Sequence, residues 1–306
     1  MAVTMSLLRV SIWVLAAGML AGAIGFPTPS VLSSSVQPVA LIGSDDRQQR
    51  MPGDAKEEAQ GRAWCYDSGP SVKIGRAPSK RRLQSGGFAV ANATLAFESN
   101  VAVVNRHLFK DALGNDIYGP EKCYFEHILS GVIIAITAVE FPQVEPDSFI
   151  RGSLLPNARY QSGDFAVVRL ASTPSNSAFL TKDEIVTGAK LQKNTELKVV
   201  SNYAFNRQKK AQRTKVLCRR ERFFNLDGMR SNVYSTSCDT GSGSSGSQVY
   251  AKLDGQWKWV GVIVGENERK SGSSYEVNFQ ETVLTVFDDR LIEAYERLQS
   301  RPDTRE

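Results

Sequence analysis

Short apolar runs separated by turn-forming residues dominate the chain from about residue 64 onward. Runs rich in Val, Ile and Phe and broken by Gly, Asn, Asp and Pro are typical of an all-β protein. Helical spacing of apolar residues appears only near the end, which predicts one amphipathic C-terminal helix at about 284–299. We expect strands within residues 88–97, 101–104, 129–138, 165–170, 196–201, 258–264 and 275–279.

The N-terminal pattern differs from the rest of the chain. An apolar run of 16 residues, 10–25, follows a single basic residue, Arg9. This length is short for a membrane-spanning helix and typical of a signal-peptide core, so residues 1–25 are interpreted as a signal peptide. An uncleaved membrane anchor is the alternative. Residues 26–60 have little apolar pattern and are predicted to be a disordered linker or propeptide.

Composition and charge narrow the function classes. The 306 residues carry a net charge of +5, with basic clusters at 80–82 and 207–222. Such clusters are usually solvated loops, and no nucleic-acid-binding motif accompanies them, so we expect no nucleic-acid partner. The signal segment implies export to a secreted or periplasmic location, with membrane contact only if that segment is uncleaved.

Four cysteines suit an oxidising compartment. None forms a Cys-x-x-Cys pair, so a zinc site is not expected, and no other metal or cofactor is implied. Of the three possible connectivities we favour the sequence-local one, Cys65–Cys123 and Cys218–Cys238.

A stretch made only of glycine and serine, residues 241–247, normally predicts a flexible linker. Here it lies between Cys238-Asp239 and the apolar pair Val249-Tyr250. It is therefore either a connector or a backbone that holds one serine in an unusual position.

Two histidines, His107 and His127, restrict the possible chemistry, because serine is a poor nucleophile until a base removes its proton. Both precede the glycine/serine stretch, which excludes the serine-before-histidine order of α/β-hydrolases. His107 follows a strand-like run and can project into a cleft, whereas His127 has no such setting and is interpreted as structural or exposed. Asp164 directly precedes another apolar strand, where a carboxylate can orient an imidazole. A plain turn aspartate is the alternative.

Together, "NRHLF" (105–109), "GDFAVVRL" (163–170) and "CDTGSGSSGSQVY" (238–250) resemble the active-site segments of chymotrypsin-like serine peptidases. They are most similar to the bacterial branch that includes the glutamyl endopeptidases. The resemblance covers about residues 61–300 and implies two six-stranded antiparallel β-barrels, at about 64–180 and 185–285, with a C-terminal helix. It also implies that Ser245 is the nucleophile, His107 the general base and Asp164 the orienting carboxylate. The backbone N–H groups of Gly243 and Ser245 would form the oxyanion hole.

Three positions depart from the family pattern. Ser244 replaces the aspartate that receives the freed N-terminus in the animal enzymes, so that activation switch is not expected. Gln248 stands where proline is usual. Val264 stands where many relatives carry a serine that hydrogen-bonds the triad aspartate, which argues for reduced catalytic power.

The resemblance also suggests the substrate-binding residues Asp239, Ile263, Val264 and Gly265. Asp239 lies six residues before Ser245, where a carboxylate favours Lys or Arg before the scissile bond. A structural role in holding the loop is an equal alternative. Glutamate specificity is disfavoured, because Ile263 stands where that subgroup uses a histidine.

The sequence therefore predicts an exported, monomeric serine endopeptidase that acts on protein or peptide substrates. A catalytically silent homologue that serves as a secreted binding module is the first alternative. A β-rich secreted protein with an accidental glycine/serine linker is the second.

Overall fold

The computed structural model describes residues 48–49, 57–66, 88–110, 114–143, 163–205, 211–223, 232–238, 240, 243–270 and 277–302. The predicted signal peptide and most of the predicted 26–60 segment lie outside these ranges. No helix within them is long and apolar enough to cross a membrane.

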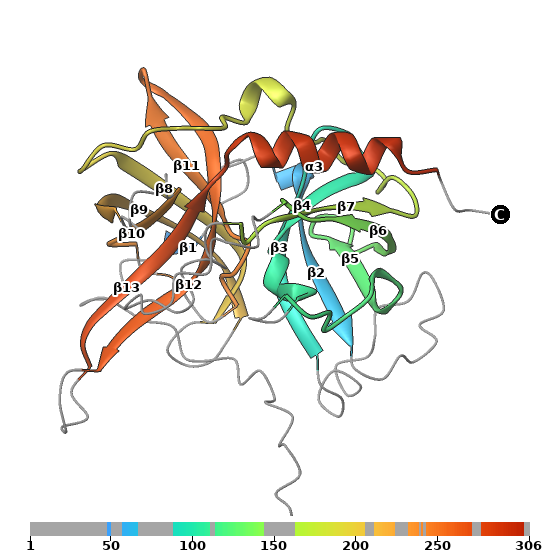
Figure 1. The fold of residues 1–306 in the computed structure, drawn as a ribbon, viewed down its shortest axis with the longest axis horizontal. Coiled ribbons are helices and arrows are strands. Elements are labelled where there is room, and N and C mark those ends of the chain that lie inside the picture. Colours follow the sequence, from blue (N-terminus) through green and yellow to red (C-terminus); the bar gives the residue numbers. More distant parts are fainter. Residues whose placement is uncertain are drawn as a thin grey trace, which may run out of the picture. The chain divides into compact units, whose positions relative to one another are not determined.

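Six strands between Gln60 and Leu170 close into an antiparallel barrel (Figure 1). Each strand pairs only with antiparallel neighbours, which lets the chain return through short connections. Around the barrel, the order is β2 (Gln60–Tyr66), β3 (Phe88–Leu95), β4 (Val101–Val104), β7 (Ala166–Leu170), β6 (Ile133–Glu140) and β5 (Cys123–His127).

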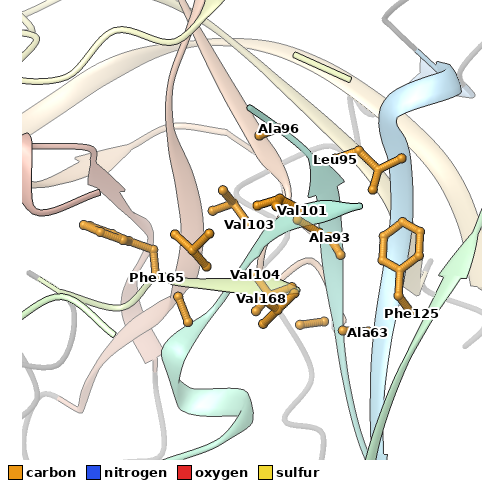
Figure 2. Close-up of a cluster of buried hydrophobic side chains, with 14 of the residues drawn as sticks. Ala63, Ala93, Leu95, Ala96, Val101, Val103, Val104, Phe125, Phe165 and Val168 are labelled. Atoms are coloured by element: carbon orange, nitrogen blue, oxygen red, sulfur yellow. The ribbon is translucent and has the colours of Figure 1, made fainter. Parts of the chain in front are cut away.

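The interior of this barrel is filled by small and branched apolar side chains. Figure 2 shows Ala63, Leu95, Val103, Phe125 and Val168 converging from different strands. All residues of β4 and β7 are buried, so neither strand has the alternating apolar and polar pattern, and Arg169 is the one charged residue in them. In β5 the burial alternates along the strand, as expected when one face is covered and the other is partly solvated.

The second half of the chain forms another antiparallel sheet, in the order β9-β10-β13-β12-β11-β8, with the short β1 (Gln48–Gln49) at the edge beside β9. β8 also pairs with β9, which joins the two ends of this order. Together with the first barrel and the C-terminal helix, this sheet confirms the predicted fold class. The strands are β8 (Glu196–Phe205), β9 (Ala211–Phe223), β10 (Val233–Thr236), β11 (Gln248–Leu253), β12 (Gln256–Lys270) and β13 (Val277–Val286).

One expectation from the charge pattern is wrong. The charge pattern predicts a solvated loop at 207–222, but β9 occupies Ala211–Phe223 and pairs with β1, β8 and β10. Successive side chains on a strand point to opposite faces. Val216 accordingly enters the core while the next residue, Leu217, is 59% exposed. Abundant charge therefore does not exclude a strand.

The C-terminal helix α3 (Asp289–Ser300) packs against β6 and β7 of the first barrel (Figure 1). Asp288 caps its N-terminus, because the side chain accepts a hydrogen bond from the Arg290 backbone N–H. Leu291, Ala294 and Leu298 form its buried stripe. Four short 3-10 helices also occur in the described ranges: η1 (Glu57–Ala59), η2 (Arg106–Leu108), η3 (Pro120–Lys122) and η5 (Lys182–Glu184).

Two disulfides, Cys65–Cys123 and Cys218–Cys238, have the predicted pairing. Cys65 and Cys123 are direct partners in the register of β2 and β5, so this bond crosses neighbouring strands. The first barrel begins at Gln60, and both Ala59 and Gln60 are fully buried. The last residues of the predicted 26–60 linker thus belong to the folded body.

Candidate active site

His107 and Asp164 are brought together by the pairing of two strands. β4 and β7 run antiparallel, with Val104 opposite Ala166. The end of β4 therefore lies beside the start of β7. His107 lies in η2, directly after β4, and Asp164 lies two residues before β7. The short apolar runs noted in the sequence thus place a histidine and an aspartate at one end of the first barrel.

Two hydrogen bonds hold this pair. The His107 backbone N–H donates to Asp164 Oδ1 at 2.8 Å, and His107 Nδ1 lies 2.6 Å from Asp164 Oδ2. The Asp164 side chain is 1% exposed, whereas the His107 side chain is 38% exposed. The carboxylate is thus fixed and buried behind the imidazole, and the imidazole retains access to solvent.

The environment of His107 shifts its pKa. Burial favours the neutral imidazole, but the charge of Asp164 and the hydrogen bond that the imidazole donates to its carboxylate together favour the imidazolium more strongly. The net effect raises the pKa of His107 above its ordinary value. A histidine arranged in this way is a stronger base than a free imidazole.

Asn105 ties this pair to the second barrel. Its side chain is fully buried, and Nδ2 donates to the Asp164 carbonyl oxygen at 2.9 Å and to the Ile263 carbonyl oxygen at 3.2 Å. Its Oδ1 has no hydrogen-bond partner among the described residues. Asn105 therefore links the backbone of Asp164 to strand β12.

The turn that carries Ser245 is built on two glycines. Gly243 has φ 86° and Gly246 has φ 78°, in the left-handed region that side-chain-bearing residues rarely adopt. A Cβ on Gly246 would lie 2.1 Å from the Asn92 carbonyl oxygen. The glycines of this stretch consequently serve a tight turn packed against the first barrel.

Backbone hydrogen bonds anchor this turn to β12. The Ser247 N–H donates to the Ser244 carbonyl at 2.9 Å, and the Gly246 N–H donates to the Ile263 carbonyl at 2.9 Å. The Ile263 N–H in turn donates to the Ser247 carbonyl at 3.0 Å. These contacts exclude a linker interpretation for residues 243–247.

Ser245 is half-buried, and its hydroxyl faces the second barrel. Its Oγ donates to the Val264 carbonyl oxygen at 3.4 Å. No hydrogen bond joins Ser245 to the His107 ring, although both residues lie within the described part of the chain. The structure therefore assembles the His107–Asp164 pair but leaves the serine hydroxyl turned toward β12.

The backbone N–H groups of Gly243 and Ser245 are available to a ligand. Neither donates to an acceptor among the described residues, whereas those of Gly246 and Ser247 on the same turn are both bonded. An oxyanion hole requires amide donors that have no internal acceptor, and these two donors lie one residue apart on the same turn.

The predicted substrate-binding residues have different environments. Ile263 is 1% exposed and packs in the core of the second barrel, so its backbone rather than its side chain faces the junction of the barrels. Val264 is 8% exposed. A Cβ added to Gly265 would meet no atom within 4 Å, so open space lies beside that residue. Asp239 lies outside the described residues.

His127 is structural. It is fully buried in β5, where Nδ1 bonds with Ser130 Oγ at 2.9 Å and Nε2 lies 2.8 Å from the Glu58 carbonyl oxygen. Within the ranges that the structure describes, no group of three or more His, Cys, Asp or Glu side chains could hold a metal ion.

Sequence reasoning missed Asn92 and Asn105. Asn92 donates from its backbone N–H to the Ser245 carbonyl at 2.7 Å, across the junction between the barrels. The available signal was the polarity of both residues: each interrupts or ends an apolar run that otherwise predicts a buried strand.

Comparison with known proteins places the fold. No family model matches this sequence, and no curated protein matches it either. Solved structures, in contrast, match this chain in fold. A Glu endopeptidase in complex with MPD matches with a TM-score of 0.53 and 16% identity, over 86% of this chain and 100% of its own. A scabies mite inactivated protease paralogue matches with a TM-score of 0.52 and 9% identity, over 81% of this chain and 99% of its own. The fold is therefore chymotrypsin-like.

Proposed function

We propose that this protein is a serine endopeptidase that acts through Ser245, His107 and Asp164. The observation that carries the proposal is the bonded His107–Asp164 pair, at 2.6 Å, in a chymotrypsin-like fold. Further support comes from the glycine-built turn of Ser245 and from the two unbonded amides on it.

In this mechanism the Ser245 hydroxyl rotates about χ1 from the Val264 carbonyl toward the imidazole. His107 Nε2 accepts the hydroxyl proton while Oγ attacks the scissile carbonyl carbon. Asp164 accepts the Nδ1–H bond and stabilises the imidazolium, without taking the proton itself. The N–H groups of Gly243 and Ser245 donate to the developing oxyanion.

Collapse of the tetrahedral intermediate breaks the peptide C–N bond, and His107 gives its proton to the leaving amine. The acyl group then remains on Ser245 Oγ. Water, deprotonated by the same imidazole, attacks the ester, and the proton returns to Ser245 as the new carboxyl group departs.

The substrate chain would lie along β12 at Val264 and Gly265, where open space adjoins the backbone. Asp239 retains its two interpretations, as a selector for Lys or Arg or as a structural residue of the loop. The substrate class is protein or peptide, encountered after export directed by residues 1–25.

A catalytically silent binding protein is the second candidate. The observation that favours it is the Ser245 hydroxyl, which bonds the Val264 carbonyl rather than His107. In that case the backbone of β12 at Val264 and Gly265 would bind a peptide without cleaving it.

Hydrolysis of a peptide mixture by the mature protein separates these candidates. We expect new peptide termini, identified by mass spectrometry, that are absent with Ser245→Ala. Ser247→Ala is the matched control, because Ser247 lies on the same turn but its hydroxyl is buried against Ser201 at 2.5 Å. That variant should retain cleavage. Binding of peptides without any cleavage by the folded wild type would favour the silent homologue.

A further inference from the structure

Asn92 reaches from the first barrel to the turn of Ser245. It lies in β3, opposite Arg62 of β2, and is 2% exposed. A buried polar side chain in a strand is costly unless its hydrogen-bonding groups are used. The groups of Asn92 are used across the barrel junction.

Three hydrogen bonds run from Asn92 to this turn. The Asn92 backbone N–H donates to the Ser245 carbonyl oxygen at 2.7 Å. The side-chain Nδ2 donates to the Gly243 carbonyl oxygen at 2.9 Å and to the Ser245 carbonyl oxygen at 3.2 Å. One side chain therefore holds the carbonyl oxygens of both residues whose N–H groups are left unbonded.

The other end of the amide is also fixed. Asn92 Oδ1 accepts a hydrogen bond from the Asn202 backbone N–H in β8 at 2.7 Å. Because Oδ1 accepts there, Nδ2 must be the atom that faces the Gly243 and Ser245 carbonyls. Aspartate lacks the donor and alanine lacks both groups, so only an amide meets both demands at this position.

These contacts restrict the peptide planes around the candidate oxyanion hole. The bond to the Gly243 carbonyl restrains the plane between residues 243 and 244, and the bonds to the Ser245 carbonyl restrain the plane between residues 245 and 246. These two planes flank the plane between residues 244 and 245, which carries the Ser245 N–H. The plane between them is held by the bond from the Ser247 N–H to the Ser244 carbonyl. A rotation that moved the Ser245 N–H would break at least one of these bonds.

We propose that Asn92 is a positioning residue that holds the turn of Ser245 so that the N–H groups of Gly243 and Ser245 can receive an oxyanion. The expected effect of Asn92 on kcat rests on the proposed peptidase activity. Its expected effect on the order of the turn does not. Preorganised donors contribute more than donors that must reorient during the reaction.

The structural test is amide hydrogen exchange of Gly246 and Ser247, the two bonded amides of the turn. In Asn92→Ala we expect both to exchange about tenfold faster than in the wild type, because local opening becomes less costly. Asn232→Ala is the matched control: Asn232 is half-buried and donates to the Asp288 carboxylate at 3.2 Å, away from the turn. Unchanged exchange in Asn92→Ala overturns the proposal whether or not the protein is an enzyme.

The kinetic test uses the same variants. Loss of one oxyanion-hole donor lowers kcat by about 10²–10³. We expect Asn92→Ala to lower kcat by about tenfold to a hundredfold with little change in KM, since the donors are displaced rather than deleted.

Asn92→Asp keeps the shape of the side chain but places an acceptor against two carbonyls, so its kcat should fall further. If Asn92→Asp does not fold, the result for Asn92→Ala decides the test. An unchanged kcat in a hydrolytically active protein overturns the proposal, and an equal loss in Asn232→Ala would assign the effect to stability instead. Absence of hydrolysis by the wild type counts against the proposed function alone, because the exchange test still applies.

Discussion

The two barrels contribute unequally to the candidate site. In the first barrel, His107 and Asp164 bind each other through two hydrogen bonds that need nothing from the second barrel. In the second barrel, the turn of Ser245 bonds both strand β12 and Asn92 of the first barrel, and the Ser245 hydroxyl bonds the Val264 carbonyl. The His107–Asp164 pair is thus formed within one barrel, whereas the turn of Ser245 is held by contacts with both barrels.

Breaking the pair inside the first barrel should have the largest effect. Asp164→Asn keeps the size of the side chain and an oxygen that can accept the His107 backbone N–H. It cannot accept the Nδ1–H in the required tautomer, so kcat should fall by about 10⁴. Peptide hydrolysis measures the loss of kcat, and thermal unfolding measures any loss of stability. A fall in kcat of less than tenfold would contradict a role for Asp164 in the reaction.

The disulfides give a second comparison of the barrels. Cys65–Cys123 closes a loop with a sequence separation of 58, and Cys218–Cys238 closes one of 20. Loop-closure entropy predicts a stabilisation of about 4 kcal/mol for the first and about 3 kcal/mol for the second. Denaturant unfolding of Cys65→Ser/Cys123→Ser and Cys218→Ser/Cys238→Ser should therefore rank the first pair as the more destabilising. The reverse order would mean that native contacts, not loop length, decide the difference.

The pH dependence of activity tests whether Asp164 raises the pKa of His107. Catalysis needs the neutral imidazole, so kcat/KM should fall as the pH drops through the His107 pKa, which lies above its ordinary value. Asp164→Asn removes the causes that raise this pKa and leaves burial, which lowers it, so the midpoint should move to lower pH. An NMR titration of the His107 ring measures both midpoints, and His107→Gln identifies its signal. Identical midpoints would contradict the role of Asp164.

The same shift has a consequence for stability. Because the folded-state pKa of His107 is raised, the interaction with Asp164 stabilises the fold fully at pH below the unfolded pKa, about 6.5. This contribution is lost as the pH rises through the folded pKa. Optimal stability and optimal activity of the site should therefore lie at different pH values.

The sequence predicted the strands that consist mainly of apolar residues, such as 101–104 and the run after Asp164, because full burial leaves a clear pattern. It did not predict β9, whose charges conceal the buried Val216. The sequence also contained the clues to His107, Asp164 and Ser245, since each adjoins a strong local pattern.

The supporting contacts were not predictable in the same way. Asn92 and Ser245 are 153 residues apart in the chain, and their hydrogen bond exists only because β3 of one barrel meets a turn of the other. Nothing local to either residue encodes that contact. The side-chain direction of Ser245 was equally hidden, because it depends on the position of the Val264 carbonyl.

The most direct measurement is covalent labelling of the mature protein with a fluorophosphonate probe, followed by peptide mapping. We expect stoichiometric labelling on Ser245 alone, abolished in Ser245→Ala and strongly slowed in Asp164→Asn. A folded wild-type protein that remains unlabelled, or that is labelled on another serine, would contradict the assignment of Ser245 as the nucleophile.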